Sequence, residues 1–165
     1  MRLFAICPRI TKESNRIVVT TARRVQILLL GLLYRRVEID PTCESISLWS
    51  RYAWLFGRQR TIRFAEVTAV TYGYEDLVSD AGYFSYAHDS FDWFTVGLRL
   101  RDDTEVHLFN FVGDGTFVNH GPLPDWLYWD DFTFNITGSQ EKESRVFVDL
   151  LAKLCDVQVV PPRRY

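Results

Sequence analysis

The segment that most constrains the fold runs from Arg36 to Glu75, where runs of alternating apolar and polar residues follow one another. Side chains two residues apart lie on one face of a strand, so this alternation predicts half-buried strands. Pro41 and Gly57 mark two of the turns between the runs. We therefore predict an antiparallel meander whose apolar positions are Val37, Ile39, Ile46, Leu48, Tyr52, Trp54, Phe56, Ile62, Phe64, Val70, Tyr72 and Tyr74.

The composition favours one mainly β domain over residues 1–165. Of the 165 residues, 47% are hydrophobic and 15% are aromatic. A chain of this length buries a substantial core without disulfides or metals. Aromatic side chains suit the pleated surfaces of sheets, which agrees with the alternating runs.

The charge is divided unevenly along the chain. Residues 1–65 hold twelve Lys/Arg and four Asp/Glu, a balance of +8, whereas residues 66–165 hold seven and seventeen, a balance of −10. The two charges either pair within the fold or between copies, or they leave a basic face for an anionic partner. We expect a protein partner or self-association first, keep a peripheral anionic membrane as an alternative, and expect no nucleic acid because the net charge is −2.

The cysteines and the apolar runs bear on the compartment. Cys7, Cys43 and Cys155 form no CxxC pair and show no metal-ligand spacing. The longest apolar run, Ile27 to Tyr34, has eight residues, far fewer than the roughly 20 that span a bilayer. We therefore expect reduced thiols and a cytoplasmic protein, at most peripheral to the membrane.

The rest of the chain yields further predictions. Residues 25–34 are interpreted as a strand buried on both faces, or alternatively as a short buried helix, with a bend at Gly31. Residues 94–109 form a hairpin with a tight turn at Asp102–Asp103. Residues 76–92 and 112–136 are interpreted as long loops, and a short strand is expected at Ile17–Val19.

A helix is predicted near the C-terminus, over about residues 139–155. Thr137 and Gln140 have the spacing of a capping box, and acidic residues follow in the first turn. The apolar stripe of this helix is expected to comprise Val146, Phe147, Leu150, Leu151 and Leu154.

The segments Val37–Asp40 and Arg60–Val70, the hairpin from Phe94 to Phe111 and the closing helix resemble the pleckstrin-homology (PH-like) superfold, and most closely the bacterial PH-like domains of unknown role. The resemblance covers roughly residues 25–156, with 1–24 as an extension and 157–165 as a tail. It implies a bent antiparallel barrel of about seven strands with a C-terminal capping helix. The long segments 76–92 and 112–136 also fit a calycin-like or another small barrel. PH-like domains bind lipids, peptides or proteins, so the resemblance does not supply a ligand.

Two groups of residues are candidate binding sites. Arg58, Arg60 and Arg63 lie on or beside one predicted strand, although Arg60 shares the phase of Ile62 and Arg63 does not. Trp126, Tyr128 and Trp129 stand in the aromatic segment 112–136, and such residues often anchor interfaces. The interpretation is a non-catalytic binding or scaffold module of unknown ligand, with no cofactor and no assigned catalytic or metal-binding residue.

Two alternatives remain open. A metal- or carboxylate-dependent hydrolase would use His88, Asp89 and Asp92, whose side chains are of metal-ligand type. A small-molecule carrier barrel would need an open, apolar interior.

Overall fold

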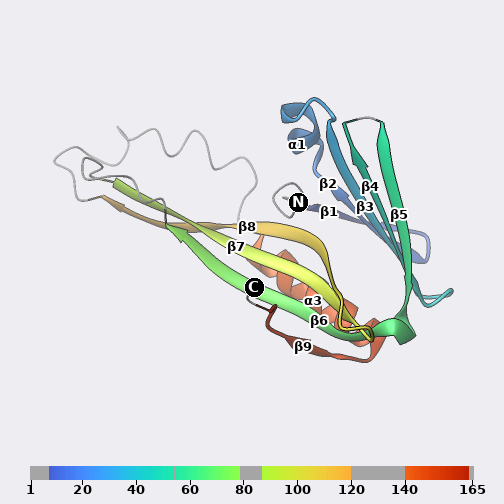
Figure 1. The fold of residues 1–165 in the computed structure, drawn as a ribbon. Helices are drawn as coiled ribbons and strands as arrows, with labels where there is room; N and C mark the ends of the chain where they lie inside the picture. Colours follow the sequence, from blue (N-terminus) through green and yellow to red (C-terminus); the bar gives the residue numbers. More distant parts are fainter. Residues whose placement is uncertain (1–7, 54, 79–86, 120–139, 164–165) are drawn as a thin grey trace.

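The computed structural model describes residues 8–53, 55–78, 87–119 and 140–163. Within this part of the chain the strands form one sheet of five and one sheet of four. Figure 1 shows the two sheets meeting near the short helix η1 and spreading apart toward their other ends. The mainly β fold predicted from the alternating runs is confirmed.

The first sheet is antiparallel and follows the chain order. Its strands are β1 (Pro8–Glu13), β2 (Arg16–Thr21), β3 (Leu33–Asp40), β4 (Ser45–Tyr52) and β5 (Phe56–Arg63). The short helix α1 (Arg23–Leu28) connects β2 to β3. The predicted strand at Ile17–Val19 is part of β2, and Val19 lies in the core.

The second sheet has the order β8-β7-β6-β9. The chain enters it through η1 (Phe64–Glu66) and runs through β6 (Val67–Val78), β7 (Ala87–Leu100) and β8 (Glu105–Asn119). Helix α3 (Glu141–Cys155) follows and packs against β6, β7 and β8. The last strand, β9 (Gln158–Val160), pairs in parallel with β6.

One hydrophobic core joins both sheets and the helix. The predicted meander positions Val37, Ile39, Ile46, Leu48, Ile62, Phe64 and Val70 are buried. Phe56 and Tyr74, predicted to share the apolar face, are 69% and 57% exposed, and Trp54 lies outside the described residues. The ring centroids of Phe111 on β8 and Phe147 on α3 are 5.9 Å apart. Fully buried members of the core include Val37, Ile39, Ile46, Ile62, Phe109, Phe111, Phe147 and Leu151.

The expectation of a closed barrel of about seven strands needs correction. Among the described residues no strand of one sheet pairs through backbone hydrogen bonds with a strand of the other, so the five- and four-stranded sheets form no closed barrel. The hairpin β1–β2 and the strand β9 add strands at the sheet edges. η1 turns the chain from β5 into β6, so these consecutive strands do not pair with each other.

The apolar segment 25–34 also differs from the first prediction. Its beginning belongs to α1, where the Gln26 N–H donates to the Ala22 carbonyl at 3.0 Å, and not to a strand. The chain then reverses at Leu30 and Gly31, whose φ angles are 48° and 68°. The predicted bend at Gly31 is confirmed. The alternative of a short helix is also confirmed, but the helix was expected to be buried, and its Ile27 is 74% exposed.

The described parts of the segments interpreted as long loops belong to the strands of the β6–β7 and β7–β8 pairs, and residues 79–86 and 120–136 lie outside the described residues. Strand β6 continues to Val78, β7 begins at Ala87, and β8 continues to Asn119. The turn at Asp102–Asp103 is wider than predicted, since β7 ends at Leu100 and β8 begins at Glu105. Asp103 takes a φ of 66° within this turn.

The predicted C-terminal helix is confirmed, but its cap and its buried face differ from expectation. Gln140 is the N-cap residue and makes no side-chain cap hydrogen bond, and Thr137 of the predicted capping box lies outside the described residues. Its side-chain amide instead donates to the Pro8 carbonyl at 3.2 Å. Val146 is 66% exposed. The buried residues of the helix are Ser144, Phe147, Val148 and Leu151.

Candidate functional site

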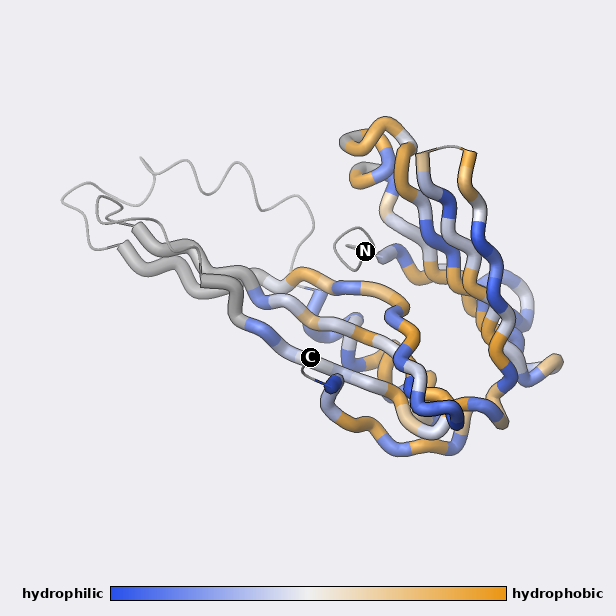
Figure 2. The backbone as a smooth tube through the Cα atoms, in the orientation of Figure 1, coloured by the Kyte–Doolittle hydropathy of each residue, from blue (hydrophilic) through white to orange (hydrophobic). Residues whose placement is uncertain are grey.

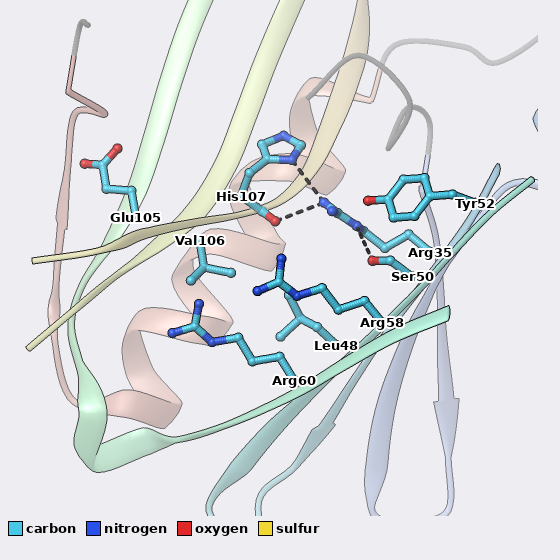
Figure 3. Close-up of a pocket in the computed structure, with 9 residues that line it drawn as sticks. All are labelled: Arg35, Leu48, Ser50, Tyr52, Arg58, Arg60, Glu105, Val106 and His107. Carbon is cyan, nitrogen blue, oxygen red and sulfur yellow. Dashed lines mark hydrogen bonds between the residues drawn. The ribbon is translucent and has the colours of Figure 1, made fainter. Parts of the chain in front are cut away.

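The candidate site is a pocket of ≈ 280 Å³ between the two sheets. Figure 3 shows its lining side chains projecting from β3, β4 and β5 on one side and from β8 on the other. Basic and polar groups dominate this lining. The residues are Arg35, Leu48, Ser50, Tyr52, Arg58, Arg60, Glu105, Val106 and His107.

Strand alternation explains why arginines point into this pocket. On β5, Arg58 and Arg60 have the same phase as the fully buried Ile62. On β3, Arg35 has the same phase as Val37 and Ile39. The inner face of the first sheet is therefore apolar near η1, where the sheets meet, and basic farther along the strands, where they spread apart (Figure 1).

Arg35 ties the two sheets together. Its Nε donates to the Ser50 hydroxyl at 3.2 Å within the first sheet. Its Nη1 crosses to β8, where it lies 2.9 Å from the His107 carbonyl oxygen and 2.8 Å from that of Leu108. These acceptors are neutral, so the hydrogen bonds orient the guanidinium without compensating its charge.

Two polar neighbours hold the ring of His107 in place. Arg35 Nη1 lies 3.1 Å from His107 Nδ1. His107 Nε2 lies 2.7 Å from Asn110 Oδ1. A bulge between Val96 and Gly97 shifts the β7–β8 register there.

Arg58 and Arg60 carry charge that the described residues do not pair. Neither forms an ion pair within 4.0 Å with a carboxylate of the described segments. Glu105, the acidic residue of the lining, is held 2.8 Å from Arg99 and points away from both arginines in Figure 3. The pocket thus presents three guanidinium groups whose charges are not neutralised by an adjacent carboxylate.

A weaker, longer-range interaction reaches Arg60 from the β7–β8 turn. The pKa of Asp102 is lowered, chiefly by hydrogen bonding from Thr104 and to a smaller extent by the positive charge of Arg60. Asp102 is exposed and does not line the pocket. It leaves the guanidinium of Arg60 available to a bound anion.

A larger hollow of ≈ 560 Å³ at the other end of the first sheet has a different character. Its charged groups pair with one another: Arg16 lies 2.8 Å from both Glu38 and Asp40, and Arg36 lies 3.3 Å from Glu38. Because these charges are compensated, the hollow offers an anion little attraction.

The structure separates the arginines named from the sequence. It brings Arg58 and Arg60 together with Arg35 and places the exposed Arg63 on the opposite face of β5. Trp126, Tyr128 and Trp129 lie outside the described residues. Arg35, Ser50, Tyr52 and His107 were not named as binding residues, although Arg35 could have been, because it continues the core-facing phase of β3.

The residues of the hydrolase alternative lie on β7. His88 and Asp89 belong to this strand instead of a loop, and Asp92 Oδ1 accepts a hydrogen bond from the Tyr74 hydroxyl at 2.8 Å. Within the described ranges no group of three or more His, Cys, Asp or Glu side chains is arranged to hold a metal ion. Burial raises the pKa of Cys155 to about 11, which keeps this thiol protonated at neutral pH.

In the part of the chain that the structure describes, no helix has the length and apolar character needed to cross a membrane. No protein-family model, curated protein or solved structure matches the chain.

Proposed function

We propose that this chain is a binding module and that the pocket between its sheets takes a small anionic group, a phosphate or a carboxylate. The proposal is carried by one observation: Arg35, Arg58 and Arg60 converge on the pocket without a carboxylate to neutralise them. A guanidinium presents several donors in a fork that matches the oxygens of phosphates and carboxylates.

The dimensions and the chemistry of the pocket support binding. Its volume of ≈ 280 Å³ lies near the lower end of small-molecule sites, about 300 Å³, which suits a small anion. Arg35 is already oriented by neutral acceptors, so little side-chain freedom is lost when the anion binds. Both ring nitrogens of His107 are engaged in hydrogen bonds, which favours a structural role for this residue over proton transfer.

The test is calorimetric titration with inorganic pyrophosphate as the probe. We expect saturable binding that weakens as salt is added, because exposed charges are screened. Arg58→Gln and Arg60→Gln should each weaken it by about tenfold or more, since a hydrogen bond to a charged group contributes roughly 1.5–3 kcal/mol.

Arg63→Gln is the matched control, because Arg63 lies on the same strand but on its opposite face. It removes the same charge from the chain and should leave pyrophosphate binding nearly unchanged. An equal loss in all three variants would show that the anion responds only to net charge, and the proposed pocket would be wrong.

A further inference from the structure

The end of the first sheet that lies away from η1 carries a group of exposed apolar side chains, which we call the apolar tip. Figure 2 shows hydrophobic residues at this end of the sheet, on α1 and at the beginning of β5. Monomeric proteins seldom leave several large apolar side chains exposed side by side unless the surface binds something. The apolar tip comprises Ile27 (74% exposed), Leu30 (74%), Leu32 (37%), Leu55 (84%) and Phe56 (69%).

Two connections build the apolar tip. One runs from α1 to β3 and the other from β4 to β5, and the Ala53 N–H donates to the Leu32 carbonyl at 2.7 Å between them. Leu30, Gly31 and Ala53 have φ angles of 48°, 68° and 49°, which turn the chain sharply at this end. The apolar side chains are therefore presented on a projecting, hydrogen-bonded edge of the sheet.

Arginines stand near the apolar tip, whereas acidic residues lie at the opposite end of the sheet. Residues 17–37 and 45–65 contain eight Arg and no Asp or Glu, although Arg63 lies at the end of β5 next to η1 and Arg36 is ion-paired with Glu38. Within them Arg51 and Arg58 stand beside the β4–β5 turn, since Arg51 pairs with Gly57 and Arg58 with Ser50. At the opposite end of the sheet lie Glu13, Glu38, Asp40 and Glu44.

We propose that the apolar tip inserts into the surface of an anionic lipid bilayer, with the neighbouring arginines at the level of the lipid phosphates. Interfacial membrane segments combine apolar side chains in the acyl boundary with basic side chains that reach the headgroups. The charge gradient along the first sheet matches this orientation, because its acidic end is directed away from the negative surface. This inference shares Arg58 with the pocket between the sheets, but it does not rest on anion binding there, which the pyrophosphate titration tests separately.

The experiment is sedimentation of the full chain with phosphatidylcholine vesicles that either contain or lack phosphatidylserine. We expect binding to the vesicles that contain phosphatidylserine, and a decrease in that binding as salt is added. The double variant Leu55→Ser/Phe56→Ser should weaken it by more than about tenfold, through loss of apolar area transferred from water. Both side chains are exposed, so the melting temperature should not fall.

Val146→Ser is the control, because Val146 is a 66% exposed apolar residue on α3, away from the tip. This variant should keep the vesicle binding of the unaltered chain. Arg60→Gln distinguishes the two proposals: loss of pyrophosphate binding with most vesicle binding retained supports separate sites.

Three outcomes would overturn the membrane inference. Absence of binding to both kinds of vesicle is the first. The second is concentration-dependent self-association that Leu55→Ser/Phe56→Ser abolishes, which would make the tip an interface between copies. The third is a clear loss of thermal stability in that double variant without a change in vesicle binding, which would mean that the tip packs against protein.

Discussion

At the junction between the sheets, Arg35 links one sheet to the other through side-chain hydrogen bonds. It donates to Ser50 on β4 and to two carbonyl oxygens on β8. A buried or half-buried carbonyl that loses its donor keeps the cost of desolvation without the compensating bond. The guanidinium therefore stabilises the junction as well as contributing charge to the pocket.

Arg35→Lys should destabilise the protein by about 1–3 kcal/mol, because a single ammonium cannot reproduce the fork of donors. Chemical denaturation monitored by circular dichroism measures this change. Arg36→Lys is the control. The Arg36 side chain is 39% exposed and lines the larger hollow, where it is ion-paired with Glu38. If both substitutions cost the same, Arg35 has no special role at the junction.

Asp40 makes the stability depend on pH at the acidic end of the first sheet. Its pKa is lowered from 3.8, chiefly by the hydrogen bond from the Cys43 N–H and further by the Thr42 N–H and by Arg16. A carboxyl whose folded pKa is lowered contributes stability above its unfolded pKa, and that contribution is lost as the pH falls through the folded value.

Asp40→Asn should therefore lower the melting temperature at neutral pH, and its difference from the unaltered chain should shrink as the pH falls from about 5. Thermal melts across this range measure the effect. Glu44→Gln alters a carboxyl in the same turn that accepts no hydrogen bond from the described residues, so its difference should stay nearly constant. A constant difference for Asp40→Asn would contradict the assignment.

At the scale of the element, the β7–β8 pair shows how one glycine permits close packing. Gly97 lies at the bulge where the register shifts, opposite His107. A Cβ added there would lie 2.6 Å from Thr71 Oγ1 and 2.9 Å from the Val106 carbonyl oxygen. Real Cβ atoms do not approach backbone oxygens so closely, so β6 or β8 would have to move.

Gly97→Ala should destabilise the protein by about 1–3 kcal/mol, the usual cost of overpacking a filled interior. The displacement should also disturb the neighbouring Arg35–His107 contact and weaken pyrophosphate binding. Gly57→Ala is the control, because no atom lies within 4 Å of a Cβ added at Gly57. Urea denaturation of both variants provides the measurement, and equal costs would show that crowding at the bulge is unimportant.

The elements that the sequence predicted best are strands with one solvent-exposed face and one buried face. Val37, Ile39, Ile46 and Ile62 alternate with polar residues, and all four are fully buried. The segment 25–34 has no such alternation, and uniform hydrophobicity normally indicates burial. Here the segment lies partly in an exposed helix and turn. Its continuous hydrophobicity therefore wrongly indicated burial for the residues that form the apolar tip.

At the scale of the whole molecule, the sequence identified two of the pocket's arginines but not the pocket itself. Arg58 and Arg60 were recognised on their strand, whereas their convergence with Arg35 follows from the register of β3, β4 and β5, in which Arg35 pairs with Ser50 and Ser50 pairs with Arg58. The opposite wall of the pocket comes from β8, in the second sheet, which the chain enters through η1, and η1 has no strong local signature. The uneven charge distribution was visible in the sequence, but its alignment with the strands of the first sheet was not.

The parallel pairing of β6 with β9 has a consequence for synthesis. The ribosome completes β6 at Val78, yet the strand that covers the Ala69–Thr71 part of its edge comprises residues 158–160. At 5–20 residues per second, translation leaves this edge open for on the order of 10 s. An uncovered edge is a template for pairing with another nascent chain. The elongation rate, more than the speed at which the second sheet folds, therefore sets how long each new molecule is vulnerable to aggregation.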